Sequence, residues 1–434
     1  SGAAWRRRDG WYALAVVLVL GLAVVARGLY AAPPPGYELR HDQRDYDQHA
    51  LSLARGEGYS RRVAYGRPTA FRPPGYPYFL AGVYRLAGVE HAPAQERVEA
   101  ARKANVVVGT LVVALIGLLA AQLWRRRVAL VAMAIAAVYV PLIVVGGSVM
   151  SELLFTALVL GALVLAVEHR RSTRRRYAYA VAAGAMAGLA MLTRANAAIL
   201  LVPLAIAAWD ARPRWSRRAL GPPLALLATA LVLLVPWTVR NASQLHAFVP
   251  FTTQVGSALA GTYNDQARTD PVNPGAWRSI RHVPEYADFW AQRRTTPEAV
   301  LDRRLRATAW RYIADHPLYV AEVWWWNTRR MADLAGRERS RATAATITID
   351  RAWADRAVTC FWVVAALALV GAAARPARRA PAWLWAVPAL LYLSVVLLAV
   401  ETPRYRTALD PFVILLAAVG LVAAGDRLRR RATT

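Results

Sequence analysis

The residues best suited to chemistry gather in one polar stretch, 36–81, that follows the first long apolar run of the chain. Its first half is crowded with acidic, phenolic and imidazole side chains: His41, Asp42, Asp45, Tyr46, Asp47 and His49. Its tail reads FRPPGYP, in which prolines fix the backbone angles around Arg72. Carboxylates held beside a rigid arginine can accept a proton and can stabilise the charge of a departing anion. We therefore expect this stretch to be the catalytic loop.

Composition indicates a polytopic membrane protein. The chain has 434 residues, 57% of them hydrophobic, with a mean hydropathy of +0.27, and its apolar residues fall in long uninterrupted blocks. The net charge of +27 comes largely from arginine clusters at the ends of these blocks, where they act as topology signals, so we exclude nucleic-acid binding. The single Cys360 excludes an intramolecular disulfide. The preference for Arg over Lys suggests a GC-rich, bacterial genome.

About ten apolar runs are predicted to span the membrane, with every dense arginine cluster on one face. They include 11–31, 104–124, 128–146, 152–167, 195–209, 219–237, 357–373, 381–400 and 407–424. This arrangement predicts a protein of the cytoplasmic membrane with both termini in the cytoplasm and the large connections outside. The apolar stretch 76–88 is too short to span, so we expect an interfacial or re-entrant helix there.

The predicted fold class is an all-α polytopic membrane protein in three parts. Residues 1–239 form an N-terminal module of seven spans with a catalytic first loop, 32–103; residues 240–356 form an extracytoplasmic loop or small cap; residues 357–434 form the C-terminal spans. Within the cap, Thr296-Pro297-Glu298 predicts a helix start. The run Trp324-Trp325-Trp326 is typical of headgroup anchoring, and a sugar-stacking platform is the alternative.

Glu152 is the acid at the outer start of a predicted span, and two interpretations remain open. A carboxylate is costly inside a bilayer, which favours a functional role for one at a span end. The same residue could stabilise a helix N-terminus, with Ser151 as its N-cap. No GxGxxG motif after a strand and no GxxxxGK[ST] motif occurs, so nucleotide chemistry has no support.

The segments HDQRDYDQHALSLARGEGYS and PTAFRPPGYPYFLAGVYRLAG resemble the first extracytoplasmic loop of GT-C-fold glycosyltransferases that depend on polyprenyl phosphate. The resemblance is to protein mannosyltransferases and aminoarabinose transferases, especially their bacterial relatives. It continues through GSVMSELLF, LTR, PWTVRN and RYR, and it leaves the insert 240–356 unmatched. It implies a GT-C-like fold with interfacial helices in the first loop and a mainly helical cap.

The resemblance also implies the site. In such enzymes the acid four residues before the loop tyrosine is the catalytic base, and here these residues are Asp42 and Tyr46. Asp45 or Asp47 could share or take that role. We expect Glu152, Asp45 and Asp47 to face the acceptor or a metal. Tyr46 and His41 are expected to support the loop.

The residue types suit sugar transfer independently of the resemblance. A base must take the hydroxyl proton, and cations must stabilise the departing phosphate. Arginine binds phosphate through its planar fork, and the candidates for donor phosphate binding are Arg72, Arg194, Arg404, Tyr405 and Arg406. A divalent cation, Mg²⁺ or Mn²⁺, could bridge Asp42 and Glu152. A zinc site with His41 and His49 is an alternative.

Three functions stay open. The first is an inverting membrane glycosyltransferase, a hexosyl- or pentosyltransferase, that moves a sugar from a polyprenyl-phosphate donor to a hydroxyl acceptor (lipid, glycan or protein) in the cell envelope. The second is a lipid or sugar transporter or flippase, for which charged or broken helices are expected at the bilayer midplane. The third is a non-catalytic membrane subunit that binds a lipid-linked sugar. The acids of the first loop favour the first function.

Overall fold

The computed structural model describes residues 2–34, 36–60, 67–209, 216–397 and 402–431, and all of its long elements are helices. The helices of the apolar domain are α1 (Gly2–Ala31), α4 (Ala94–Leu123), α5 (Arg126–Val138), α6 (Val140–Gly146), α7 (Glu152–Arg171), α8 (Arg176–Thr193), α9 (Leu201–Ala208), α10 (Arg217–Val232), α11 (Val235–Leu245), α18 (Arg351–Ala373), α19 (Arg375–Arg378), α20 (Ala382–Val396) and α21 (Asp410–Arg431). The protein is thus an all-α polytopic membrane protein, as its apolar blocks predict.

Within the described residues, six helices are long and apolar enough to cross a membrane, or up to seven if a bent pair counts as one span. That pair is α5 and α6, which meet at 51° where we expect a single span, 128–146. Pro141 explains the break, because a proline lacks the N–H that continues a helix. Two shorter apolar helices, Ala195–Ala208 and Ala382–Val396, complete the set. The expected count of ten therefore stays a prediction, and the end of predicted span 381–400 lies outside the described residues.

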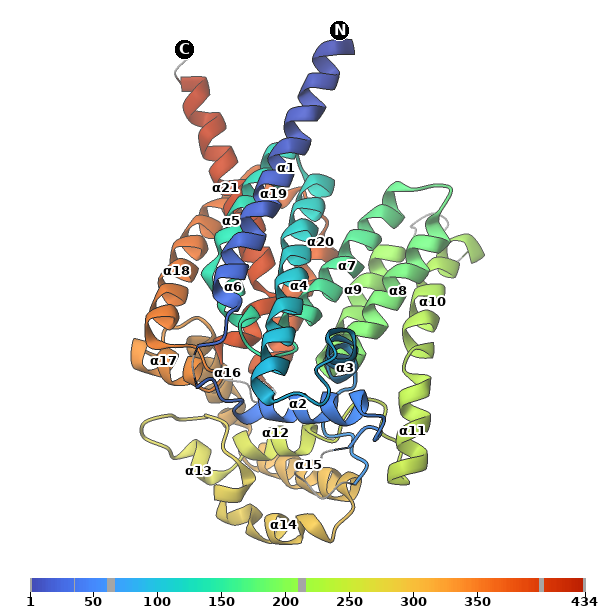
Figure 1. Cartoon of the computed structure of the whole chain (residues 1–434), viewed down its shortest axis with the longest axis vertical. Coiled ribbons are helices and arrows are strands. Elements are labelled where there is room, and N and C mark those ends of the chain that lie inside the picture. The colour runs from blue at the N-terminus through green and yellow to red at the C-terminus, as the bar shows by residue number, and fades with distance from the viewer. Residues whose placement is uncertain (1, 35, 61–66, 210–215, 398–401, 432–434) are drawn as a thin grey trace.

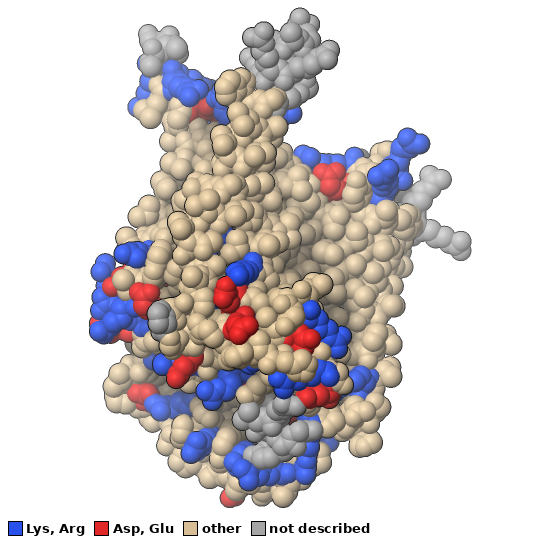
Figure 2. Space-filling view, viewed as in Figure 1, with Lys and Arg blue, Asp and Glu red and all other residues tan. Residues whose placement is uncertain are grey.

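The two termini lie together at one end of the helix bundle, and the helices of the 240–356 insert cover the other end (Figure 1). In the face drawn in Figure 2, a broad belt without charged side chains separates the charged end near the termini from the charged half of the molecule that includes the insert. This distribution agrees with a chain that crosses a bilayer along its long axis.

Glycines let the helices of the bundle approach closely. A Cβ added at Gly184 in α8 would lie 2.3 Å from the carbonyl oxygen of Leu226 in α10. One at Gly371 in α18 would lie 1.8 Å from the carbonyl oxygen of Leu416 in α21. Close backbone approach of this kind is typical of helix pairs in membranes, where packing rather than the hydrophobic effect drives association. Helix α7 is the most buried of the candidate spans.

The first loop forms two helices, α2 (His41–Ala54) and α3 (Gly75–Ala87). Helix α3 is the short apolar helix expected at 76–88, and it ends at Gly88 in a left-handed conformation. The insert contributes α12 (Val255–Thr262), α13 (Asp265–Arg268), α14 (Ala287–Ala291), α15 (Glu298–Asp315), α16 (Pro317–Met331) and α17 (Arg337–Ala345). Helix α2 lies between the bundle and the helices α12 and α15 (Figure 1).

Glu298 joins the insert to the first loop. The expected helix start at 296–298 is present, although Pro297 takes the N-cap position and not the first helical position. The Glu298 carboxylate accepts hydrogen bonds from the Thr69 hydroxyl at 2.6 Å, from the Ala70 backbone N–H at 2.9 Å and from the Thr253 hydroxyl. The insert is therefore fastened beside the FRPPGYP corner and can contribute to a site there.

Candidate active site

Helix α2 presents its acids on two faces. Asp42 and Asp45 are three residues apart and share a face, and both contact Arg72. Asp47 points elsewhere: its carboxylate accepts hydrogen bonds from Arg97 at 2.7 and 2.9 Å and from the Tyr84 hydroxyl at 2.9 Å. His41 begins the helix with a positive φ of 45° and is exposed. The acids that lie close together in the sequence of this loop therefore belong to two separate groups of ion pairs.

Arg72 is buried and makes the first cationic contact with Asp42. Its Nη2 lies 2.5 Å from Asp42 Oδ1 and 3.0 Å from Asp45 Oδ2, and its Nη1 donates to Gln254 Oε1 at 3.2 Å. The prolines that follow fix the backbone here, and the Tyr59 hydroxyl donates to the Arg72 carbonyl oxygen at 2.9 Å. Arg72 is thus held in place by its backbone and by three side chains.

Arg404 makes the second contact with Asp42, from the opposite end of the sequence. It lies in the turn η6 (Pro403–Ala408), and its Nη2 donates to Asp42 Oδ2 and, at 3.0 Å, to the Tyr405 hydroxyl. Burial alone would raise the pKa of Asp42, but the charges of Arg72 and Arg404 outweigh burial and hold this pKa well below its usual range. Asp42 is therefore an anion at neutral pH, and both of its carboxylate oxygens are bound by arginines.

Glu152 lies at the start of α7 and is 3% exposed. Its Oε1 accepts a hydrogen bond from Arg194 Nη1 at 3.1 Å and lies 3.8 Å from Arg404 Nε. Its Oε2 is buried and has no hydrogen-bond partner among the described residues. Ser151 occupies the N-cap position without a side-chain capping bond, and its hydroxyl lies 3.3 Å from the hydroxyl of Tyr46. Both the pairing with Arg194 and the unsatisfied oxygen favour the functional interpretation of Glu152.

These groups line one cavity of about 150 Å³. Of the residues predicted from sequence, it contains Asp42, Tyr46, Arg72, Glu152, Arg194, Arg404 and Tyr405. The guanidinium of Arg194 lies over the Tyr405 ring, 4.5 Å from its centroid. The cavity has polar residues that sequence reasoning missed: Asn196, Thr252, Gln254 and Ser394. Gln254 carries no sequence signal, since it is one polar residue in a long insert without a recognisable motif.

Arg406 is not part of this cavity, contrary to the expected phosphate clamp. Its Nη1 lies 3.0 Å from Asp333 Oδ2, its Nε lies 3.0 Å from Asp410 Oδ1, and its guanidinium stacks 3.4 Å from the Phe361 ring centroid. Alternate residues of an extended or 3-10 turn point to different sides, so Arg404 and Arg406 cannot both face Asp42. Asp45 likewise holds Arg72 and does not line the cavity.

An apolar groove of about 560 Å³ adjoins the cavity. Its walls come from α3, α7, α8 and the α10–α11 region, with leucine side chains predominating: Leu154, Leu158, Leu189, Leu192 and Leu233, beside Tyr78, Phe79 and Trp237. Thr193 lines both spaces, and the neighbours Pro73 and Pro74 line one each. A Cβ at Gly75 would lie 2.6 Å from Thr193 Oγ1, so only glycine allows α3 to approach at this junction. The charged cavity and the apolar groove therefore adjoin at Thr193.

The donor set does not fit a bridging metal ion. The Arg404 guanidinium reaches both Asp42 and Glu152, so a cation already occupies the space that a metal would need. No group of three or more His, Cys, Asp or Glu side chains that could hold a metal is found in the parts of the chain that the structure describes. His49 is buried with Nδ1 2.7 Å from the Asp45 carbonyl oxygen, whereas His41 is exposed.

Comparisons with known proteins bear on the fold of the chain. Residues 71–239 match the family model of dolichyl-phosphate-mannose-protein mannosyltransferases. The chain matches no curated protein sequence. Among solved structures, it is similar to the oligosaccharyltransferase AglB from the archaeon Archaeoglobus fulgidus in complex with an inhibitory peptide and a dolichol-phosphate, with 13% identity and a TM-score of 0.55. That match covers 98% of this chain and 52% of AglB, so the chain spans about half the length of that relative.

Two further structures are similar. One is the Archaeoglobus fulgidus oligosaccharyltransferase in complex with Zn and sulfate, with 14% identity, a TM-score of 0.52, and coverage of 96% of this chain and 50% of that one. The other is ArnT from Cupriavidus metallidurans bound to undecaprenyl phosphate, with 16% identity, a TM-score of 0.45, and coverage of 96% and 79%. With the match over residues 71–239, the arrangement of the helices identifies the chain as a membrane protein of the GT-C fold, the fold of glycosyltransferases that use polyprenyl-phosphate carriers.

Proposed function

We propose that the chain is a glycosyltransferase that moves a sugar from a polyprenyl-phosphate donor to a hydroxyl acceptor on the extracytoplasmic face of the membrane, with Asp42 as general base. The observation that carries this proposal is the junction at Thr193 and Pro73-Pro74, where a cavity with an acid and arginines meets an apolar groove. A ligand that fills both spaces has a charged, polar head and a long apolar tail. A sugar on a polyprenyl phosphate has that form.

The residues at the junction suit the donor's phosphate. Arg194 directly follows Thr193, its guanidinium lies over the Tyr405 ring, and its Nη1 donates to the Glu152 carboxylate. Arg404 lies in the same cavity. A phosphate in a partly buried site gains more from charge-assisted hydrogen bonds with guanidinium groups than the same contacts give in water. The leucine-lined groove would receive the first isoprene units of the tail, where burial of apolar surface stabilises binding.

The reaction is a single displacement at the anomeric carbon. The acceptor oxygen forms a bond to that carbon while its hydroxyl proton passes to the Asp42 carboxylate. The bond from the carbon to the phosphate oxygen breaks, and the electron pair leaves with the polyprenyl phosphate, whose charge Arg194 and Arg404 stabilise. The configuration of the sugar is inverted because the acceptor attacks opposite the leaving group. Asp42 can act only after one of its arginines releases an oxygen.

The test is binding of undecaprenyl phosphate to the full chain in lipid nanodiscs, followed by native mass spectrometry. Leu189→Trp adds bulk to the groove at a position that is 38% exposed and should weaken binding by about tenfold or more, since overpacking costs about 1–3 kcal/mol. Val181→Trp is the matched control, because Val181 lies on the same helix, is 42% exposed and does not line the groove.

Equal binding by the wild type and Leu189→Trp would show that the groove is not the lipid site.

Measurement of turnover distinguishes a transferase from two other functions. A non-catalytic subunit that holds a lipid-linked sugar, or a flippase, would bind the lipid and keep its role in cells when Asp42 becomes Asn. A transferase would lose the glycan product, which mass spectrometry of the cell envelope detects.

A further inference from the structure

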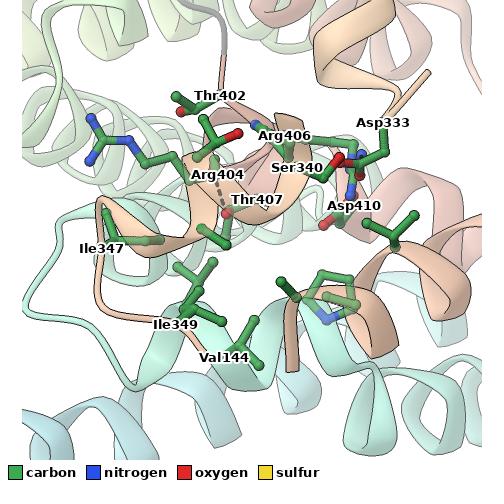
Figure 3. A pocket seen from close by; sticks show the side chains of 18 residues that line it. Val144, Asp333, Ser340, Ile347, Ile349, Thr402, Arg404, Arg406, Thr407 and Asp410 are labelled. Atoms are coloured by element: carbon green, nitrogen blue, oxygen red, sulfur yellow. Dashed lines mark hydrogen bonds and ion pairs between the residues drawn. The ribbon is translucent and has the colours of Figure 1, made fainter. Parts of the chain in front are cut away.

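A second cavity, of about 60 Å³, lies beside η6 and shares Arg404 with the cavity around Asp42. Aliphatic side chains from α6, α18 and the turn that joins α17 to α18 form much of its wall (Figure 3). The rest of the wall carries hydroxyl and charged groups from α17, η6 and the start of α21, together with Asp333 and Thr402. Val144, Ile347, Ile349, Val358, Thr402 and Arg404 are among the residues that line it. In Figure 3 the Arg404 side chain extends away from the other labelled polar residues.

This cavity is attached to the residues next to the proposed base. The Gln43 side chain donates from Nε2 to the Thr348 hydroxyl at 2.9 Å, and Thr348 lies between two of the cavity's isoleucines. The Ser148 hydroxyl donates to the Ile347 carbonyl oxygen at 2.9 Å, which fixes the same turn to the segment before α7. Arg404 lines this cavity and also contacts Asp42, so it stands between the cavity and the proposed base.

The cavity and the apolar groove lie on opposite flanks of α2. The helices α17 and α18 are on one side of the molecule, and α8 and α11 are on the other (Figure 1). A single displacement needs the acceptor oxygen on the side of the anomeric carbon opposite the phosphate. If the donor's phosphate and tail occupy the groove side, the acceptor hydroxyl must approach Asp42 from the side of the second cavity.

We propose, resting on the transferase function above, that this second cavity binds the hydroxyl-bearing end of the acceptor and that the acceptor is an alcohol with an aliphatic body. Once the donor's phosphate has drawn Arg404 away from Asp42 Oδ2, the acceptor's proton passes to Asp42 and its oxygen takes the sugar, while the donor's phosphate leaves with the bonding electrons. The walls contributed by Val144, Ile347, Ile349 and Val358 are apolar, and the charged lining residues Asp333, Arg406 and Asp410 are already paired with one another. The cavity therefore disfavours a ligand rich in polar groups, because each buried polar group without a partner is costly.

Two further features define the acceptor's size and its polar group. A volume of about 60 Å³ has room for roughly four water-sized groups, which suits a short aliphatic segment next to a hydroxyl and not a whole peptide loop. Thr402 Oγ1 is buried and lacks a hydrogen-bond partner among the described residues. An acceptor hydroxyl would satisfy it, since a hydroxyl both donates and accepts. Helix α18, a candidate membrane span, forms one wall, so the acceptor could enter from the lipid.

The experiment uses the full chain in nanodiscs and a photoreactive probe, an alkyl alcohol that carries a diazirine. We expect the label on the peptide that contains residues 346–358. Ala357→Phe fills the cavity from α18 and should reduce this labelling about tenfold, because the added ring has no space. Ala366→Phe is the matched control on the same helix at an exposed position, and it should label like the wild type.

Thr402→Val gives a second variant that keeps the side-chain shape and removes a hydroxyl that bonds to nothing described in the fold. It should also reduce labelling, whereas a serine-containing peptide should not compete with the probe. Unchanged labelling in both cavity variants, or competition by the peptide and not by an unlabelled alkyl alcohol, would overturn the proposal.

Binding of undecaprenyl phosphate is measured in the same samples. It should persist in Ala357→Phe and Thr402→Val, which shows that these variants fold. Cavity labelling in a wild-type chain that does not bind undecaprenyl phosphate would leave the alcohol site standing and refute the donor assignment, so the two proposals fail separately.

Discussion

Arg404 donates a hydrogen bond to Asp42 across a sequence separation of 362 residues, and with Arg72 it engages both carboxylate oxygens of the proposed base. Arg72 is also held by Asp45 and Gln254, so it is the fixed partner. Arg404 also contacts Tyr405, Glu152 and the Met150 sulfur, but its buried Nε has no hydrogen-bond partner among the described residues and can take another acceptor. A donor phosphate would compete with Asp42 for Arg404, and its arrival would uncover Oδ2. Donor binding would therefore precede removal of the acceptor proton.

Replacement of Arg404 by Gln should shift the pH dependence of the enzyme. The two arginines lower the pKa of Asp42, so removal of one positive charge raises that pKa. The base is active when ionised, and a higher pKa means that it becomes protonated at a higher pH. The acid limb of the kcat/KM profile, which reports the free enzyme, should therefore move to higher pH in Arg404→Gln. Measurement of kcat/KM as a function of pH in both proteins checks this.

The control for that shift is Arg40→Gln. Arg40 directly precedes the helix of Asp42, but its side chain is 56% exposed and its charge is screened by solvent. Its replacement should leave the acid limb in place. A shift of equal size in both variants would mean that general surface charge, and not the Arg404 contact, sets the pKa of the base.

Asp42→Asn tests the base directly. The amide keeps the shape of the carboxylate but cannot take a proton, so turnover should fall by about 10² to 10⁴, the usual contribution of a general base. Undecaprenyl-phosphate binding should persist, because the groove and Arg194 are intact. Asp45→Asn should cost less turnover, since Asp45 holds Arg72 and does not line the cavity. Full turnover in Asp42→Asn would transfer the role of base to Glu152.

Asp47→Asn should lower stability and spare turnover. Asp47 and Arg97 form a buried ion pair, with side chains that are 5% and 10% exposed. Removal of one partner from a buried pair leaves an uncompensated charge and costs about 3–5 kcal/mol. Thermal unfolding of the purified protein should show the loss as a lower Tm, while kcat per folded molecule stays unchanged. A normal Tm with abolished turnover would return Asp47 to the list of candidate bases.

Chelation should leave turnover unchanged. Glu152 Oε1 binds Arg194, and Arg404 reaches both carboxylates, so arginine supplies the positive charge that a metal would otherwise provide. Activity measured after dialysis against EDTA, with and without added Mg²⁺ or Mn²⁺, tests this. A loss of activity that Mg²⁺ or Mn²⁺ restores would show that Arg404 moves away to admit a metal between Asp42 and Glu152.

The fold follows from the sequence where hydrophobic runs are long. The helical class, the short helix at 76–88 and the helical insert were all predicted, because length and apolar continuity determine them. The break between α5 and α6 was not predicted, since Pro141 lies inside an otherwise continuous apolar run. There Arg27 Nη1 and Nη2 donate to the carbonyl oxygens of Ala137 and Ala136 at 3.0 Å, a repair that no pattern in the sequence indicates.

Side-chain direction limits what the sequence can tell about the site. Asp42, Asp45 and Asp47 are equally plausible acids in a loop of unknown conformation, and only the helical phase of α2 sends Asp47 to Arg97 and Asp42 to the cavity. The same limit applies to the RYR motif, because its two arginines are equivalent until η6 turns one to each side. Gln254 enters the cavity through tertiary packing of the insert, for which no local signal exists.

Arg406→Lys and Arg194→Lys should have opposite effects. Arg406 is buried between Asp333 and Asp410 and donates to the Met331 carbonyl oxygen, so it fastens the end of α16 to the start of α21. A lysine keeps the charge but cannot make these contacts from one planar group. We therefore expect Arg406→Lys to lower Tm while its folded fraction binds undecaprenyl phosphate with normal affinity. Arg194→Lys should change Tm less than Arg406→Lys does. It should bind the lipid about tenfold more weakly, because a forked contact to phosphate is lost. Native mass spectrometry of both variants beside thermal unfolding separates the two roles. Weak lipid binding by Arg406→Lys at an unchanged Tm would instead place Arg406 at the phosphate.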